Sequence, residues 1–277
     1  TTADSTLAAG DALLLSHRFE GQNLQHLKKG SSGAKSLTLS FWVRSPKTGT
    51  HIAELYDSDN ARHLSKSYTI STADTWEHKT ITYAGDTSGS FNNDNNLSLL
   101  INFWLGAGTT YSSGTLQSSW GSVTNANRAA GQVNVFDSAS NNFYITGVQL
   151  EVGDTATPFE HRSYGEELAL CQRYFVRLTN TAQNCPIGSV MAYAKGTIWG
   201  FICPYFQPMR ARAKPGERGN FNFTGSAVTV TGSINNLNCT DVGWFTGGWG
   251  TGSNLSAGEA SVIQITTTGK LDADAEL

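Results

Sequence analysis

The sequence predicts an all-β protein: an antiparallel jelly-roll sandwich, a short connecting helix and a second, smaller β domain. Segments in which apolar and polar residues alternate recur along the 277 residues, and clusters of Gly, Asn, Asp and Ser separate them. Near residue 156 the alternation stops, and a helical pattern follows before strands resume. We therefore expect a sandwich at 1–155, a junction with a helix at 156–175 and a C-terminal β domain at 176–277.

The strands of the first domain follow from an alternation with a period of two. Residues 37–45 (LTLSFWVRS) have an apolar face formed by Leu37, Leu39, Phe41 and Val43. Further strands are expected at 11–19, 50–56, 76–83, 97–105, 131–136 and 142–152. Residues 97–105 are the most continuously apolar, which predicts a central strand. Seven or eight strands with irregular loops are typical of two sheets that bury their inner faces against each other.

The junction carries the signals of a helix start. Pro158 keeps Thr157 extended, and Ser163 followed by Glu166 fits a capping box in which each side chain bonds the other residue's backbone N–H. Apolar residues then recur at helical spacing, at Leu168, Cys171 and Phe175. The pattern predicts a helix over about 164–174 that docks on both domains.

Strands resume in the C-terminal domain. Residues 188–206 predict a hairpin, and residues 208–218 (PMRARAKPGER) a basic loop. Short strands are then expected at 221–225, 227–234, 241–249, 260–268 and 270–277. Because apolar residues alternate up to Leu277 in a domain of low charge, we expect this domain to be buried between chains.

Composition narrows the function classes. Charged residues make up 15% of the chain, below the roughly 25% usual for soluble domains, and such a neutral polar surface is typical of extracellular or virion β proteins. The net charge of -3, with no basic patch, argues against nucleic-acid binding. No apolar run is long enough to predict a membrane span, and TTADSTLAAGD lacks the features of a signal peptide. Because the chain opens on Thr1, we expect it to be part of a longer protein.

No motif predicts catalysis or a cofactor. Gly85–Gly89 (GDTSG) places Thr where a nucleophilic Ser would stand, and His161 is expected to be an ordinary surface residue. Residues 57–60 (DSDN) and 92–96 (NNDNN) offer oxygen ligands but predict polar turns, so a structural calcium ion stays open. The spacing of Cys171, Cys185, Cys203 and Cys239 matches no zinc signature, and they are expected to be small buried residues, with disulfides left open. Paired carboxylates that converge only in space are also left open.

Aromatic residues in polar surroundings are the candidate binding residues. Trp244 and Trp249 lie in a Gly-rich segment and could clamp a sugar if the glycines between them turn. Tyr111 and Trp120 lie in a long Gly- and Ser-rich loop. Sugars stack their C–H faces on such rings, while nearby polar groups bond the hydroxyls. The alternative is that these rings fill the sandwich or a contact between chains. Trp42, on the polar face of its strand, could instead pack under the helix.

The run ITGVQLEVGDTATPFEHRSYGEELALCQRYF resembles the junction segment of phage tail-fiber and related virion proteins from marine and other environmental phages. EGQNLQHL, KSLTLSFWVRSPKTGTHI and NFWLGAGTTYSSG upstream, and PYFQPMRARAKPG and DADAEL downstream, extend the resemblance over nearly the whole chain. It implies a virion protein assembled in the host cytoplasm, a sandwich like that of carbohydrate-binding modules, and a homotrimer that contacts other virion proteins. It implies no catalytic residues.

Three functions follow as expectations. The first is a non-catalytic, distal host-recognition segment of a fiber that binds a cell-surface polysaccharide. The second is a purely structural fiber or decoration protein. The third is a tailspike-type polysaccharide hydrolase.

Overall fold

The chain divides into two compact units, Thr1–His161 and Arg162–Glu276. The computed structural model describes residues 3–179, 185–194, 197–204, 214–218, 220–225, 229–233, 236–239, 244–250, 260–265 and 270–274, with side chains as far as Val176. The division falls inside the junction predicted at residues 156–175. The predicted limits of the two domains, 1–155 and 176–277, stay a prediction. None of the described helices is long and apolar enough to cross a membrane.

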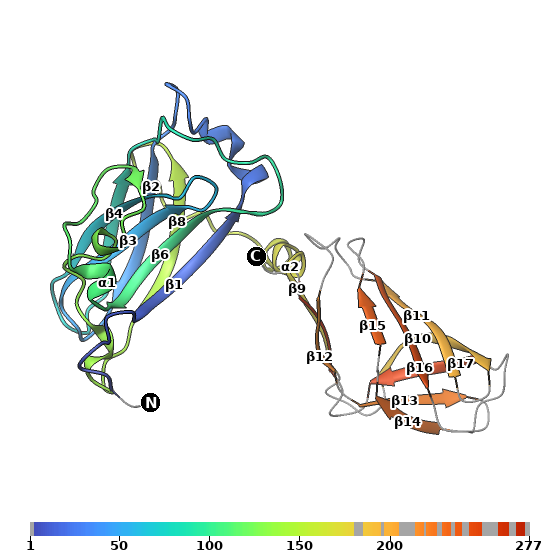
Figure 1. The fold of residues 1–277 in the computed structure, drawn as a ribbon. Coiled ribbons are helices and arrows are strands. Elements are labelled where there is room, and N and C mark those ends of the chain that lie inside the picture. Colours follow the sequence, from blue (N-terminus) through green and yellow to red (C-terminus); the bar gives the residue numbers. More distant parts are fainter. Residues whose placement is uncertain are drawn as a thin grey trace. The chain divides into compact units, whose positions relative to one another are not determined.

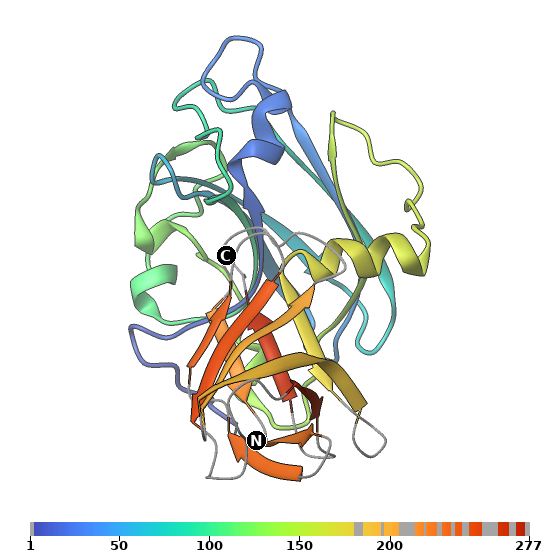
Figure 2. The same ribbon diagram turned by 90° about the vertical axis from the view of Figure 1, so that its right-hand side faces the viewer.

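Two antiparallel sheets packed together form the first unit, as the sequence predicts (Figure 1 and Figure 2). The five-stranded sheet has the order β1 (Ala12–Glu20), β6 (Leu97–Ala107), β3 (Gly49–Asp57), β4 (Arg62–Ile70) and β7 (Gly121–Ser122). The three-stranded sheet has the order β5 (Glu77–Tyr83), β2 (Leu37–Arg44) and β8 (Tyr144–Val152). The connections hold short helices: η1 (Gly21–Leu27), α1 (Thr109–Ser112), η2 (Asn125–Asn127) and η3 (Val135–Asp137).

The core lies between the two sheets and confirms the period-two alternation. Leu39, Phe41 and Val43 of β2 are fully buried, while Trp42 between them is exposed. Phe41 meets Tyr68 of β4 and Phe103 of β6 edge to face, at ring-centroid distances of 5.1 and 5.2 Å. The apolar segment 97–105 is β6, which has a partner strand on each side, as a central strand must.

Residues 108–137 cover the outer face of the five-stranded sheet. Ala129 and Tyr111 pack there on Ile52 of β3 and Trp104 of β6. Residues 131–136 belong to this cover, so the strand predicted there is wrong: Gly131 has a φ of +91°, and Val133 makes one backbone hydrogen bond to β3, at the carbonyl of Thr50. β4 is not among the strands predicted from the sequence, because Lys66 and several Ser and Thr residues obscure its alternation.

A buried glutamate fastens this cover to the sheet. Glu54 of β3 is fully buried, and Arg128 donates to both of its carboxylate oxygens at 2.7 and 2.9 Å. The Arg128 guanidinium also lies over the rings of Tyr56 and Trp104, 4.8 and 5.3 Å from their centroids. Burial alone would raise the pKa of Glu54, but the neighbouring His63 and Arg128 outweigh it and hold that pKa below its ordinary value.

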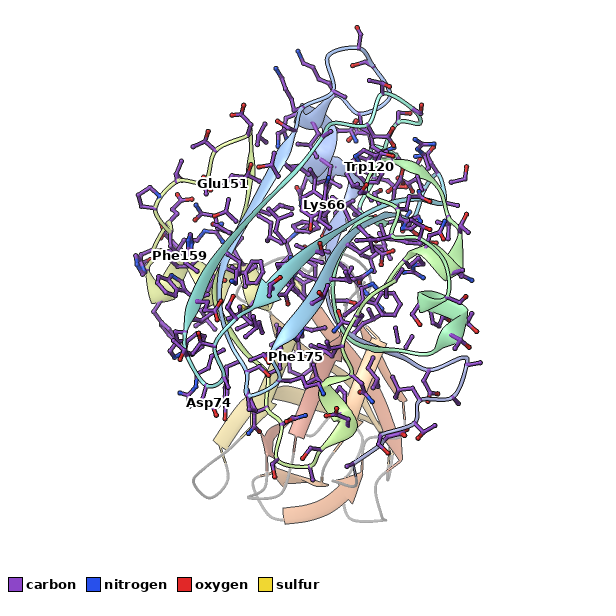
Figure 3. The ribbon with its side chains drawn as sticks, turned by 90° about the vertical axis from the view of Figure 1, so that its left-hand side faces the viewer. Lys66, Asp74, Trp120, Glu151, Phe159 and Phe175 are labelled. Carbon is purple, nitrogen blue, oxygen red and sulfur yellow. The ribbon has the colours of Figure 1, made fainter. Side chains whose placement is uncertain are left out.

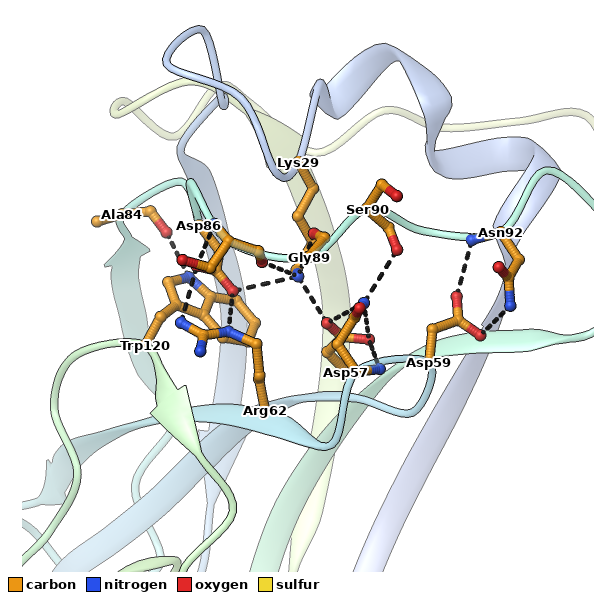
Figure 4. A network of polar contacts seen from close by, with 12 residues as sticks. Lys29, Asp57, Asp59, Arg62, Ala84, Asp86, Gly89, Ser90, Asn92 and Trp120 are labelled. Carbon is orange, nitrogen blue, oxygen red and sulfur yellow. Dashed lines mark hydrogen bonds and ion pairs between the residues drawn. The ribbon is translucent and has the colours of Figure 1, made fainter.

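A second buried polar network surrounds Lys29, which follows η1 (Figure 4). Its ammonium lies 2.6 Å from Asp57 Oδ2 and 3.1 Å from Asp86 Oδ2, and it donates to the carbonyls of Ser88 and Gly89 at 2.8 Å. Its side chain is only 4% exposed. Arg62 binds the Asp86 carboxylate through two hydrogen bonds, at 2.7 and 3.0 Å. The network therefore ties β3, β4 and the 84–90 loop to the end of η1.

The second unit begins with α2 (Tyr164–Gln172), the longest described helix, and confirms the predicted capping box. The Ser163 hydroxyl accepts from the Glu166 N–H at 3.3 Å, and the Glu166 carboxylate accepts from the Ser163 N–H at 3.0 Å. No residue of α2 is buried, and Cys171, expected to be buried, is exposed with a free thiol. The docking expected of this helix stays a prediction.

From Phe175 onward, the described residues of this unit lie in strands. A seven-stranded sheet has the order β14 (Thr229–Ser233), β13 (Asn220–Gly225), β17 (Ala260–Ile265), β10 (Cys185–Ala194), β11 (Thr197–Pro204), β16 (Trp244–Gly250) and β15 (Asn236–Cys239). A three-stranded sheet has the order β12 (Lys214–Arg218), β18 (Lys270–Asp274) and β9 (Phe175–Thr179). The hairpin predicted at 188–206 is confirmed as β10 and β11. The basic-loop prediction is wrong for β12, where an edge position accommodates Pro215.

Candidate functional site

Exposed aromatic rings gather on the outer side of the three-stranded sheet. Trp42, Trp76, Tyr144 and Phe159, which we call the aromatic face, are each between 42% and 46% exposed. Single exposed rings are common on proteins, but a group of them on one surface marks a binding or contact site. Figure 3 shows Phe159, Glu151 and Asp74 along one margin of the first unit, with Trp120 on its other side.

Strand register arranges this surface in rows. Trp42 lies opposite His78 of β5 and Thr146 of β8, and Arg44 lies opposite Tyr144. Trp76 directly precedes β5 at the same end of the sheet. Two rows further along β2, Thr38 lies opposite Thr82 and Glu151. One end of the surface is therefore aromatic, and the other end carries hydroxyl and carboxylate groups.

The chain itself crosses the polar end of this surface. Residues 153–160, which we call the strap, are held by side chains of the sheet. Thr38 donates its hydroxyl to the Gly153 carbonyl at 2.9 Å, and Glu151 accepts from the Thr157 N–H at 3.0 Å. The Gln149 amide oxygen accepts from the Glu160 N–H at 2.8 Å. The strap therefore places Phe159 on the sheet while leaving the aromatic end open.

A bulge in β8 brings Phe159 and Trp42 together. The register shifts between Ser40 and Trp42, and Gly147, on the opposing strand, has a φ of +59°. A Cβ at Gly147 would stand 3.4 Å from the Trp42 ring and 3.9 Å from the Phe159 ring. Both rings thus flank one glycine, whose conformation other residues adopt only with strain.

An arginine lies beside the remaining two rings of the face, over Tyr144. Trp76 and Tyr144 lie 6.5 Å apart between ring centroids, and the Arg44 guanidinium carbon lies 5.6 Å from the Tyr144 centroid. The nearest carboxylate to Arg44 is Asp74, at 3.9 Å, and both side chains are substantially exposed. Trp42 in turn contacts His78 at a centroid distance of 5.1 Å. The face thus offers flat apolar rings together with hydrogen-bond donors.

Two of the residues singled out from the sequence pack inward instead of forming an exposed surface. Tyr111 lies on α1 against Trp104, 5.4 Å between centroids, in the cover over the five-stranded sheet. Trp120 packs partly against the main core, and its indole N–H donates to the Ala84 carbonyl at 2.7 Å. Trp120 also lines a pocket with Leu27, Phe91 and Lys29, but this pocket has room for about one water molecule and cannot enclose a sugar ring.

Trp244 and Trp249 have side chains outside the described residues. Their backbone belongs to β16, which pairs with β11 from Trp244 to Gly250 and with β15 from Phe245 to Gly248. The backbone from Trp244 to Gly250 is therefore a single strand, so the glycines between the two residues do not form the turn that a clamp requires. Their role as glycan contacts stays a prediction.

In the two candidate calcium loops, carboxylate oxygens accept hydrogen bonds from groups of the protein itself. Asp57 accepts from Lys29, while the Asp59 carboxylate accepts from the backbone and side-chain amides of Asn92 at 3.0 and 2.9 Å. Asp94 accepts from Asn96 in the same way. Among the residues with described side chains, no group of acidic, His and Cys side chains is arranged to hold a metal ion.

Spacing in the sequence predicts only part of the aromatic face. Alternation along 37–44 places Trp42 and Arg44 on the outer face, and this was visible from spacing alone. Trp76, Tyr144 and Phe159 were missed, because they meet Trp42 and Arg44 only through the pairing of β2 with β5 and β8 and through the strap. The alternative that Trp42 packs under the helix stays a prediction, while its described contacts are His78 and the surroundings of Gly147.

No protein-family model matches this chain, and no curated protein matches it significantly in sequence.

Proposed function

We propose that the chain is a non-catalytic, distal segment of a phage virion fiber that attaches to a polysaccharide on the host surface. The aromatic face on the first unit is the single observation that supports this function best. The finer jelly-roll assignment of the sandwich belongs to the same proposal, as does location in the virion, and both rest on the resemblance of the sequence to tail-fiber proteins.

Aromatic rings beside hydroxyl and amide groups suit sugar recognition. A pyranose stacks its C–H face on an indole or phenol ring, and polar neighbours then bond the hydroxyl groups. Trp42 and the pair formed by Trp76 and Tyr144 lie in successive rows of the sheet. Adjacent rows on one strand are about 7 Å apart, which is a spacing that neighbouring sugars of an extended chain can match. The face is therefore proposed to bind a linear polysaccharide over at least two units.

Replacing Trp42 by Ala tests the proposed face. The loss of one stacking ring, worth about 1 kcal/mol, should weaken polysaccharide binding roughly fivefold to tenfold without unfolding the protein, because Trp42 lies outside the core. Binding is measured by affinity electrophoresis through gels that contain host-derived polysaccharides. The matched control is Phe136→Ala, which removes a comparably exposed ring (41%) from η3, in the cover over the five-stranded sheet. Equal binding by both variants would refute the assignment.

A homotrimer is part of the proposal. Three copies on a fiber would raise the avidity of weak sites without new contacts. Sedimentation should give a trimer at micromolar concentration, with subunit contact through residues 176–277. A stable monomer would reject this assembly.

The purely structural fiber or decoration protein is the alternative that the same face favours, because exposed rings also fit a contact with another virion protein. Trp42→Ala would then weaken particle assembly and leave polysaccharide binding unchanged. The tailspike-type hydrolase is the less favoured candidate. It predicts release of reducing sugar from host polysaccharide, which the attachment function does not.

A further inference from the structure

We propose that the aromatic face selects a polysaccharide that bears carboxylate groups, and that Arg44 contacts the acid group of the sugar. This inference rests on the proposed glycan-binding function and deepens it by naming the class of ligand.

Arg44 is held far more loosely than Arg62 and Arg128, the two arginines of the same unit that bind a carboxylate bidentately. Arg62 and Arg128 each bind a carboxylate through two hydrogen bonds no longer than 3.0 Å. Arg44, by contrast, comes no nearer than 3.9 Å to Asp74, beyond hydrogen-bond reach. Its Nε is buried without a hydrogen-bond partner among the described residues. A guanidinium offers five donors in a planar fork that fits a carboxylate, so Arg44 retains its capacity for one.

Arg44 lies beside the aromatic rings on which a sugar would stack, so the carboxylate it could bind is one carried by that sugar. The guanidinium carbon lies 5.6 Å from the Tyr144 centroid, and Tyr144 lies 6.5 Å from Trp76. The side chain is 40% exposed, so a ligand can reach it. A sugar stacked on these rings would place a carboxylate on its ring carbon within reach of Arg44.

The charges around Arg44 leave its positive charge available. Lys79 and Glu77 pair with each other at 2.6 Å. Glu151 lies in the row of Thr38, six residues along β2 from Arg44. That separation is about 20 Å, more than twice the screening length of about 8 Å at physiological ionic strength. Asp74 is therefore the carboxylate that competes with a ligand at Arg44, and it is 59% exposed.

This arrangement predicts opposite effects for two variants. Arg44→Gln should weaken binding to an acidic polysaccharide about tenfold, because it removes a charge-assisted bidentate contact. Asp74→Asn should strengthen that binding severalfold, because it removes the competing charge and changes little else. Arg18→Gln, at an exposed arginine of β1, is the matched control and should leave binding unchanged. Equal melting temperatures would show that all three variants are folded.

The probes are alginate, polygalacturonate and hyaluronate, each compared with its carboxyl-reduced neutral form, and a glycerol-phosphate polymer. Affinity electrophoresis at low and high salt should show binding to a carboxylate polymer that fails after reduction and weakens with salt. Equal binding to a reduced polymer, or to the phosphate polymer, overturns the carboxylate selection and leaves glycan attachment standing. Binding to none of the probes overturns the carboxylate selection, and the proposed attachment falls with it only if binding to host-derived polysaccharide also fails.

Discussion

Replacing Lys29 by Met should lower the free energy of unfolding by about 3–5 kcal/mol, which is the usual cost of removing one partner of a buried ion pair. The Lys29 ammonium is enclosed by Asp57, Asp86 and two backbone carbonyls (Figure 4). Met fills the space of the side chain, but it leaves two carboxylates close together with one fewer cation and two carbonyls without a donor. Urea denaturation of the full chain measures the loss.

The same substitution at Lys35 is the matched control. Lys35 is exposed in the same loop region and makes no ion pair among the described residues, so Lys35→Met should change stability by less than about 0.5 kcal/mol. A Lys29→Met protein as stable as the control would show that the ammonium does not support the fold.

At acidic pH, the difference in the free energy of unfolding between Lys29→Met and the wild type should become smaller. Burial opposes ionisation of Asp86, but hydrogen bonds from Arg62, the Ser88 N–H and Lys29 outweigh it and lower its pKa. A carboxyl whose pKa is lower in the folded state stabilises the fold above its unfolded pKa, and this contribution is lost as the pH falls through the folded value. Because Lys29→Met has already lost part of this contribution, the free energies of unfolding of the two proteins should converge as the pH falls below about 4, the ordinary pKa of an aspartate.

Replacing Arg128 by Met should cost about 3 kcal/mol and loosen the cover formed by residues 108–137. Glu54 is fully buried and would lose the cation that binds both of its oxygens. Met preserves some packing against Tyr56 and Trp104, so the loss reports on the charge pair more than on volume. Hydrogen exchange should become faster at the backbone amides of Ala129 and Val133, which bond the Tyr111 and Thr50 carbonyls.

Arg18→Met is the control for the loss of an arginine. Because Arg18 is exposed on β1, this substitution should leave the free energy of unfolding almost unchanged. If Arg128→Met lowers the free energy of unfolding but leaves hydrogen exchange in residues 108–137 unchanged, the Glu54–Arg128 pair does not hold the cover to the sheet. Because the pKa of Glu54 is lowered in the fold, the stability it contributes is lost in acid, and the wild type should lose more stability than Arg128→Met below about pH 4.

The local structure of this protein follows from short-range patterns in its sequence. Alternation located most strands of the first unit, including the inward Leu39, Phe41 and Val43, because side chains of a strand alternate between faces whatever the partner strand is. The Ser163–Glu166 capping box located the start of α2 for the same reason: its bonds lie within one turn. Where local patterns were mixed, as in β4, or imitated a strand, as at residues 131–136, the prediction failed.

Contacts between residues far apart in the sequence could not be predicted in this way, because they form only in the complete fold. Tyr111 and Trp120 occupy a polar loop in the sequence, yet the loop folds back and turns them toward the sheet. Trp42, Trp76, Tyr144 and Phe159 are spread over more than a hundred residues and form one face only because β2 pairs with both β5 and β8 and the strap returns across them. Lys29, Asp57 and Asp86 come together in the same way. Such contacts depend on strand register and loop closure, which local propensity does not encode.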